Sequence, residues 1–375
     1  MYKYIYVDDT QDQIEIGAIN GIKQGGVIDV DFVKPGLWEE KITELTEKLK
    51  TSHGLIVDLR LNDMPYDDVN RAQYRGSTVA QELRTLVKEQ TIIDIPIFLI
   101  SADQKLHESL DKTSLDLFDG VISKNTIGNT GITFPEFIKM LSAYAEAYVL
   151  IQDQKSIIQL LKIEDIQLLD TRFVDEFEKT SPYPNHVIIR FISKEFIQKT
   201  TILVDEDTLA SRLGIDMSSD DWGSFKDEFL KEFLYQGILS RYYERWWWPL
   251  IEDWWYNKIT QDLTIRTLPA KERVEFLKSL KEGIRLKPAS MSEKSKSDKF
   301  WTICKARKIP IDTVDGFLVA GQDNNFPWQE KEYVSNDEAL RPKDIEAWKS
   351  VATVEKNRLQ SMKDFYGKQE QRVRR

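Results

Sequence analysis

The 375-residue sequence has few of the residues that build disulfides and soft-metal sites. It contains one cysteine, Cys304, and three histidines. A single thiol excludes a disulfide within the chain and a zinc site made from this chain's thiolates alone. His53, His107 and His186 lie far apart, with no spacing typical of metal ligands. We therefore expect the histidines to be surface residues or residues whose hydrogen bonds are satisfied.

Long apolar runs and two common catalytic motifs are also missing. No apolar run reaches the length that spans a bilayer, and the N-terminus has no basic and apolar leader. We expect a cytoplasmic protein with no membrane partner. There is no glycine loop ending in lysine to cradle a nucleotide phosphate, and no Gly-x-Ser-x-Gly turn. These absences argue against the nucleotide-binding and hydrolase classes that use those motifs.

Charge is unevenly divided along the chain. Residues 1–150 hold 15 basic and 24 acidic residues, a net charge of −9, whereas the remainder holds 37 and 38. An acidic N-terminal part argues against nucleic-acid binding by that part, because phosphate contacts need lysine and arginine.

The first 150 residues alternate short apolar runs with segments of helical periodicity. Strands are predicted over 2–7, 27–33, 54–59, 95–101 and 119–124, and helices over 37–50, 77–89, 104–112 and 134–152. Residues 10–24 form a polar stretch. Continuous apolar strands alternating with helices predict a doubly wound, five-stranded parallel sheet that is covered on both faces.

Polar residues stand where these strands end. Asp8 and Asp9 follow the first strand, Asp58 ends the third, Ser101 the fourth and Lys124 the fifth. Ligands of such sheets bind beyond the carboxyl ends of the strands. Three close carboxylates need a cation, and Mg²⁺ with oxygen ligands would supply it. The lysine and the serine hydroxyl would then hold an anion such as phosphate.

The segments YVDD, GLIVDLRL, FLISA and GVISK, in this order on these strands, resemble the receiver domain of two-component response regulators. The resemblance covers about residues 1–150 and implies a flavodoxin-like fold. It implies a Mg²⁺ site made by Asp8, Asp9, Asp58 and the backbone carbonyl of Arg60. It also implies that Asp58 accepts a phosphoryl group from a histidine kinase, with Ser101 holding that group and Lys124 pairing with it. Enzyme activity beyond slow self-dephosphorylation is not expected.

Three features depart from the family pattern. Extra length after Asp58 falls in the acidic and polar segment 62–76, Asn125 follows Lys124 where proline is usual, and Val121 stands where an aromatic residue is usual. The insertion could cover the site, add recognition for one kinase, or lock the domain in one state. The domain could also be a receiver kept for its surface alone.

Beyond residue 150 the alternation ends. We predict a connector at about 151–185, with a proline-containing loop at 181–185, and a mostly α-helical, tryptophan-rich domain over the rest of 151–375. The Ser/Lys-rich segment 287–299 is predicted to be a mobile loop.

One segment of this second part resembles the start of a helix-turn-helix motif. It lies near 205–240, with Asp207 as a candidate helix cap. DNA binding is disfavoured because residues 151–269 carry a net charge of −7 and the continuation is acid-rich. An ordinary capped helix is the favoured interpretation.

The most unusual segment is RYYERWWWPLIEDWWYNKI, residues 241–259. Pro249 fits the first turn of a new helix. An apolar face at helical spacing is formed by Trp247, Leu250, Ile251, Trp254 and Trp255. A buried aromatic core is the favoured role for most of them. A protein-binding surface and a stacking platform for single-stranded nucleic acid are the alternatives.

These observations favour a bacterial-type signalling protein. Phosphorylation at Asp58 with Mg²⁺ would change how the C-terminal module meets a protein partner. Two alternatives remain open at this point. One is a transcriptional regulator that uses the helix-turn-helix-like element. The other is a degenerate receiver that acts as a scaffold or sensor in a multiprotein assembly, such as an antiphage system.

Overall fold

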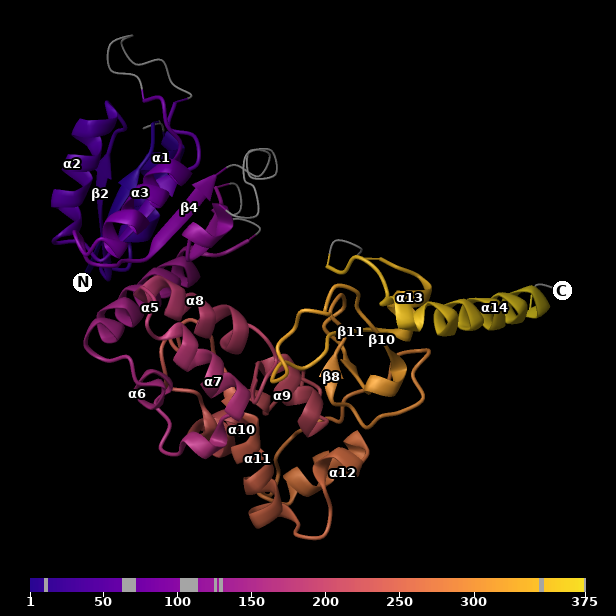
Figure 1. The fold of residues 1–375 in the computed structure, drawn as a ribbon. Coiled ribbons are helices and arrows are strands. Elements are labelled where there is room, and N and C mark those ends of the chain that lie inside the picture. Colours follow the sequence, from indigo (N-terminus) through magenta and orange to yellow (C-terminus); the bar gives the residue numbers. More distant parts are fainter. Residues whose placement is uncertain are drawn as a thin grey trace. The chain divides into compact units, whose positions relative to one another are not determined.

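The structure is a computed structural model that describes residues 1–9, 13–62, 72–101, 114–124, 127, 131–343 and 347–373. It divides into two compact units (Figure 1). The first unit comprises residues 1–166, 174–193 and 236–243, and the second comprises 167–173, 194–235 and 244–375. The chain therefore passes between the units five times, after residues 166, 173, 193, 235 and 243.

The first unit begins with alternating strands and helices. In chain order these are β1 (Tyr2–Val7), α1 (Gln13–Lys23), β2 (Ile28–Val33), α2 (Trp38–Leu49), β3 (Gly54–Asp58), α3 (Gly76–Lys88), β4 (Ile97–Ser101), β5 (Gly120–Ser123) and α5 (Phe134–Asp153). The five predicted strands are confirmed. The predicted helix at 104–112 lies outside the described residues.

The strands form one parallel sheet in the order β2-β1-β3-β4-β5. This is the flavodoxin-like order, in which the chain winds both ways from a central first strand. The register pairs Val7 with Val57 and Asp58 with Ile100, so the carboxyl ends of β1, β3 and β4 lie nearly level. The predicted doubly wound parallel sheet is confirmed.

Helices cover both faces of the sheet because its side chains alternate. In β1, Ile5 and Val7 point to a buried cluster that includes Leu45 of α2 and Val79 of α3. Tyr4 points to the other face, where its hydroxyl donates to the carbonyl of Leu141 on α5 at 2.7 Å. A strand buried on both faces needs a continuous apolar sequence, and this explains why the strands were recognisable.

Two parts of the first unit differ from the sequence prediction. The polar stretch predicted at 10–24 contains helix α1, which buries Ile22 against the sheet. The unit also continues past residue 150. The hydroxyl of Tyr144 on α5 hydrogen-bonds Ser193 at 3.1 Å, and the amide of Ile238 donates to the Leu160 carbonyl at 2.8 Å. Segments 174–193 and 236–243 therefore pack with the receiver-like sheet and its helices.

After α5 the chain is mostly helical, with three short antiparallel sheets. The helices are α6 (Ile157–Leu161), α7 (Thr171–Thr180), α8 (Asn185–Ile192), α9 (Glu206–Leu213), α10 (Trp222–Phe225), α11 (Trp248–Trp254), α12 (Ala270–Lys278), α13 (Asn336–Leu340) and α14 (Lys356–Val373). The strand pairs are β6 (Leu203–Val204) with β7 (Trp246–Trp247), β8 (Thr302–Ile303) with β9 (Pro310–Ile311), and β10 (Gly316–Leu318) with β11 (Tyr333–Ser335).

The tryptophan cluster is largely core. Trp246, Trp248 and Trp255 are at most 4% exposed and pack in the second unit's main cluster, and Trp254 is partly buried against it. Pro249 stands in the first turn of α11, as predicted. Trp247 lies on strand β7 rather than on the helix. The burial favours the aromatic-core interpretation over a binding surface.

Two local predictions in the second unit need correction. Helix α9 is capped by Asp205, whose carboxylate accepts the Thr208 amide at 2.9 Å, so Asp207 is not the cap. Segment 287–299 is irregular, as predicted, but it is tied down rather than free. The amides of Lys296 and Ser297 both donate to the buried Asp315 carboxylate at 2.7 Å.

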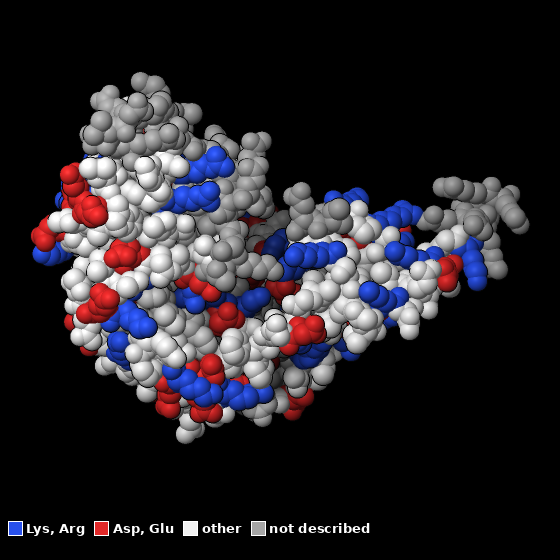
Figure 2. All heavy atoms as spheres, turned by 45° about the horizontal axis from the view of Figure 1, so that its top comes forward, with Lys and Arg blue, Asp and Glu red and all other residues white. Residues whose placement is uncertain are grey.

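Among the described helices, none is both long enough and apolar enough to span a bilayer. Acidic and basic side chains of the described residues are largely interspersed on the face shown in Figure 2.

Candidate functional site

The carboxyl edge of the parallel sheet brings three carboxylates together. Asp8 and Asp9 follow β1, and Asp58 is the last residue of β3. Their exposed fractions are 0%, 5% and 4%. One oxygen from each lies within 4.8 Å of the others, a spacing suited to a shared cation. Pairing of Val7 with Val57 in adjacent strands is what sets the two strand ends side by side.

Among the described residues, Lys124 brings a positive charge to this cluster. Its Nζ lies 2.7 Å from Asp8 Oδ2 and 2.9 Å from Asp58 Oδ1. The amide of Lys124 donates to the Ser101 carbonyl at 2.8 Å, which fixes the residue next to β4. The structure thus brings Asp8, Asp9, Asp58 and Lys124 together, as the sequence predicted.

The Asp58 carboxylate is strongly perturbed. Burial raises its pKa from the ordinary 3.8 to about 6; Lys124 opposes this shift and the Asp8 carboxylate adds to it. The other oxygen of Asp58, Oδ2, accepts the Arg60 amide at 2.7 Å. Three buried carboxylates close together repel one another, and a divalent cation bound among them would reduce that repulsion.

The backbone around Asp58 is confined by Gly76. A Cβ built on Gly76 would lie 2.1 Å from the Asp58 carbonyl oxygen, so a side chain there would force the strand end or α3 to move. The Gly76 amide donates to the Leu59 carbonyl at 3.0 Å. This glycine was not among the predicted site residues. Gly76 stands at the start of a helix, directly after the segment that follows Asp58. This position in the sequence could have indicated it.

The remaining predicted residues lie at the same edge. The Ser101 hydroxyl is buried and has no hydrogen-bond partner among the described residues, so its hydrogen-bonding capacity is unused. Val121 on β5 is 37% exposed. Arg60 lies at the edge through its amide, and its carbonyl as a metal ligand stays a prediction. Asn125 and residues 63–71 of the insertion lie outside the described residues.

The donor set fits the group that the sequence predicts. Mg²⁺ binds oxygen ligands, usually through one or two carboxylates plus substrate phosphate oxygens. Asp8, Asp9 and Asp58 offer such oxygens, and the unpaired Ser101 hydroxyl offers a donor for an anion. The edge can therefore accommodate a hard cation together with a phosphoryl group.

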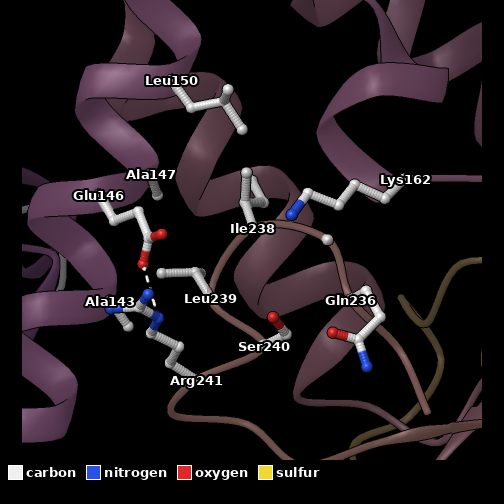
Figure 3. Close-up of a pocket in the computed structure, with 11 residues that line it drawn as sticks. Ala143, Glu146, Ala147, Leu150, Lys162, Gln236, Ile238, Leu239, Ser240 and Arg241 are labelled. Atoms are coloured by element: carbon white, nitrogen blue, oxygen red, sulfur yellow. Dashed lines mark ion pairs between the residues drawn. The ribbon is translucent and has the colours of Figure 1, made fainter.

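A cavity of about 220 Å³ lies elsewhere in the first unit, between α5 and the segment 236–241. Figure 3 shows Glu146 of α5 and Arg241 facing each other, and their ion pair measures 3.1 Å. Both side chains are substantially exposed, which makes the pair weak. The cavity marks where the returning segment meets α5.

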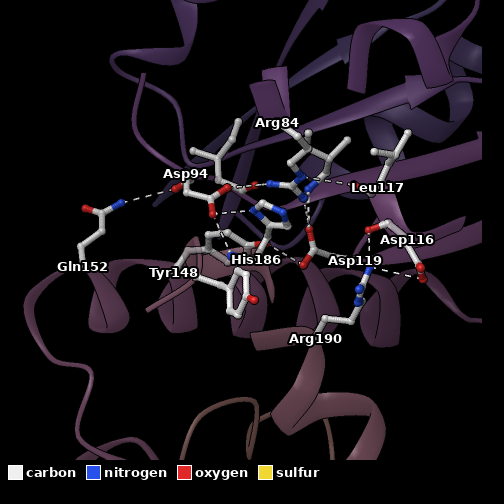
Figure 4. Close-up of polar contacts among 12 residues, drawn as sticks. Arg84, Asp94, Asp116, Leu117, Asp119, Tyr148, Gln152, His186 and Arg190 are labelled. Atoms are coloured by element: carbon white, nitrogen blue, oxygen red, sulfur yellow. Dashed lines mark hydrogen bonds and ion pairs between the residues drawn. The ribbon is translucent and has the colours of Figure 1, made fainter. Parts of the chain in front are cut away.

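Sequence reasoning also missed a buried polar network at the opposite edge of the sheet (Figure 4). Arg84 of α3 donates to Asp94 before β4 at 2.6 Å and to Asp119 before β5 at 2.9 Å. The Tyr148 hydroxyl donates to Asp119 at 2.7 Å, and the His186 amide donates to Asp94 at 2.7 Å. His186 is therefore a satisfied residue, as expected, and it links α8 to the sheet.

Comparisons with known proteins gave matches among solved structures. No protein-family model and no curated protein matches the sequence. Among solved structures, a putative response regulator from Chloroflexus aurantiacus is similar, with 16% identity over 39% of this chain and 98% of that chain, at a TM-score of 0.28. The strand order of the first unit is the flavodoxin-like one. The first unit has the flavodoxin-like fold, and we call it the receiver unit after its resemblance in sequence.

Two further solved structures match a similar share of the chain. A response regulator from Thermotoga maritima shares 14% identity over 39% of this chain and 98% of that chain, with a TM-score of 0.25. An adenylate cyclase structure from Rhodopirellula baltica shares 15% identity over 40% and 92%, with a TM-score of 0.26. The similarity lies in the N-terminal part of the chain, and the C-terminal half is unrecognised.

Proposed function

We propose that the receiver unit accepts a phosphoryl group on Asp58 in a signalling role. The observation that carries this proposal is the cluster of three buried carboxylates, within 4.8 Å of one another, beside the Lys124 ammonium. Such a cluster is costly to a fold, because like charges in a desolvated site destabilise it. A functional cation and anion would account for it.

The cation would be Mg²⁺, held by Asp8, Asp9, Asp58 and the Arg60 carbonyl. When bound, it would lower the repulsion between the Asp58 carboxylate and an incoming phosphoryl group. The structure places no second cluster of this kind among the described residues.

The chemical step is a transfer from a phosphohistidine on a histidine kinase. A carboxylate oxygen of Asp58 would form the new bond to phosphorus as the phosphorus–nitrogen bond breaks, and the electron pair of that bond would leave with the imidazole. Lys124, which pairs with Asp58 before the reaction, would move to a phosphoryl oxygen. The Ser101 hydroxyl would donate its unused hydrogen bond to another. Slow hydrolysis of the acyl phosphate is the only turnover we propose.

The output would be a protein–protein interaction of the second unit. The chain passes between the two units five times, so the backbone itself connects the receiver unit to the second unit. DNA binding is less well supported, since residues 208–213 of α9 are all buried. The one arginine of α9, Arg212, is 1% exposed and pairs with Glu330 at 2.6 Å.

Phosphorylation is tested by incubating the full chain with acetyl phosphate and Mg²⁺ and measuring intact mass. We expect wild type to gain the mass of one phosphoryl group. The Asp58→Asn variant should gain none. The matched control is Asp153→Asn, at the exposed end of α5, which should behave like wild type. Equal gain by the Asp58→Asn variant, or none by wild type, would refute the proposal.

A further inference from the structure

The second unit contains a pocket of about 380 Å³ that the receiver fold does not account for. Its walls come from α9, the turn that follows α9, the segment 289–292 and the segment 308–310. This volume falls in the range of pockets that hold small ligands or single side chains. Segments far apart in the sequence converge here, so the pocket is a product of the tertiary fold.

Apolar side chains make up about half of the lining, beside serines and charged residues. Ala210 and Ile215 are each 2% exposed and are joined by Ile309 and Pro310. Two methionines that line the pocket reach solvent, Met217 at 41% and Met291 at 50% exposure. Methionine side chains are unbranched and flexible, so they can close over the stem of a ligand. The apolar part of the pocket, with its flexible methionines, suits an aliphatic chain.

One acidic group in the pocket has no protein partner among the described residues. Among the described residues, the half-buried carboxylate of Asp207 has neither a hydrogen bond nor an ion pair. Its neighbours are already committed: Asp205 caps α9, and Asp216 accepts the Ser218 amide at 2.8 Å. Burial, together with the nearby Asp205 charge, raises the pKa of Asp207, which is the mark of a carboxylate without a sufficient counter-charge.

The pocket's own cation does not neutralise this carboxylate. Among the residues that line the pocket, Lys308 is the cationic one, and it is exposed and forms no ion pair with Asp207. Lys308 has a φ of 53°, in the left-handed region that is uncommon for lysine. The Lys308 charge lowers the Asp207 pKa, but by less than burial and the Asp205 charge raise it. A cationic ligand that pairs with this acid would be repelled by the nearby Lys308 charge.

We propose that this pocket binds a primary ammonium group carried on an aliphatic chain. The ammonium would pair with Asp207, and the chain would lie against Ile215 between Met217 and Met291. A free diamine and the lysine side chain of a partner protein share this chemistry. The proposal does not depend on phosphorylation of Asp58.

The test is calorimetric titration of the full chain at low salt with cadaverine. We expect saturable binding to wild type. Asp207→Asn should bind cadaverine at least about tenfold more weakly, because the ion pair is lost. Lys308→Met should bind cadaverine more tightly, since it removes a cation that repels the ligand. Asp227→Asn is the matched control, because Asp227 is an exposed acid of the same unit away from the pocket.

A second arm separates the two sources of the ammonium group. A capped lysine tripeptide that binds more tightly than cadaverine, and loses affinity when norleucine replaces its lysine, would identify a protein side chain as the ligand. Tighter binding of cadaverine would identify a free amine. Binding of neither compound, or equal binding by wild type and Asp207→Asn, would overturn the proposal. The Asp58→Asn variant should bind as wild type does, so this result is independent of the phosphorylation test.

Discussion

At the scale of single residues, the site depends on a glycine as much as on its acids. Gly76 lies against the backbone of Asp58, and an added Cβ would come within 2.1 Å of the Asp58 carbonyl. Backbone atoms cannot rotate away as a flexible side chain can. The backbone position of Asp58 therefore depends on Gly76, a residue without a side chain.

We predict that Gly76→Ala destabilises the protein by about 1–3 kcal/mol, because α3 or the end of β3 must shift. The same shift should weaken Mg²⁺ binding. Urea unfolding and Mg²⁺ titration measure the two effects. Gly223→Ala is the matched control, since nothing lies within 4 Å of its added Cβ, and it should leave stability unchanged or raised. Equal stability of Gly76→Ala and wild type would contradict the account.

The raised pKa of Asp58 predicts a pH dependence. The folded protein holds the Asp58 proton more tightly than the unfolded chain does. Protonation of Asp58 therefore stabilises the folded state, and this stabilisation is complete below about pH 4. It is lost as pH rises through about 6. Without metal, this group alone should cost about 3 kcal/mol between those limits.

Urea unfolding in a chelator, at about pH 4 and about pH 7, measures this effect. The difference in unfolding free energy between wild type and Asp58→Asn separates the titration of Asp58 from that of other groups. As pH rises, wild type should become less stable relative to Asp58→Asn. Mg²⁺ should stabilise wild type at the higher pH and have little effect at the lower one, where protons compete. A difference that does not vary with pH would argue against the buried, coupled acid.

The sequence was informative about residues where a strand end fixes their place. Asp8, Asp9, Asp58 and Lys124 could be predicted to meet because parallel strands end at one edge. The cap of α9 could not be settled in this way, since Asp205 and Asp207 both suit the position. The choice depends on where the backbone becomes helical. Gly76 and the unpaired Asp207 depend on tertiary neighbours, which the local sequence does not reveal.

At the scale of elements, one buried arginine joins three parts of the receiver unit. Arg84 of α3 is 6% exposed and pairs with acids that precede β4 and β5. Asp94 also binds the first turn of α8 through the amide and ring of His186. The network therefore connects α3, the sheet and α8.

Removing this guanidinium should leave two acids buried without a counter-charge. We predict that Arg84→Met destabilises the protein by about 3–5 kcal/mol, as measured by urea unfolding. Arg172→Met breaks the exposed pair between Arg172 and Asp170, and it serves as control with no measurable change expected. Similar behaviour of the two variants would show that the Arg84 network contributes little.

Elements were predictable where burial gave a clear pattern. The five strands are buried on both faces and read as continuous apolar runs, so all five were found. Helix α1 was missed because its segment reads as a polar stretch. The tryptophan-rich segment contains both a strand and a helix. Trp247 lies on the strand because the helix begins only at Trp248, with Pro249 in its first turn.

At the scale of the whole molecule, the two units are interleaved along the chain. Residues 174–193 and 236–243 come from beyond the predicted boundary but belong to the receiver unit. Local composition cannot reveal such returns, since they depend on contacts such as Ile238 with Leu160. The sequence therefore located the receiver fold without its full extent.

We predict that a fragment of residues 1–150 is less stable than the full chain. It lacks the segments that cover α5, and Tyr144 loses its partner Ser193. Thermal unfolding followed by near-ultraviolet circular dichroism would show a lower midpoint or no cooperative transition. A fragment of residues 1–243 is the comparison, because it contains every segment of the receiver unit. A 1–150 fragment as stable as the full chain would show that the returning segments are not needed.

The central claim is that Asp8, Asp9, Asp58 and Lys124 form one pocket for Mg²⁺ and a phosphoryl group. Fluorine NMR of the full chain with beryllofluoride, which mimics an aspartyl phosphate, tests it most directly. We predict bound fluoride resonances in wild type that require Mg²⁺ and are absent from Asp58→Asn. Failure of wild type to show them, or their persistence in Asp58→Asn, would contradict the account.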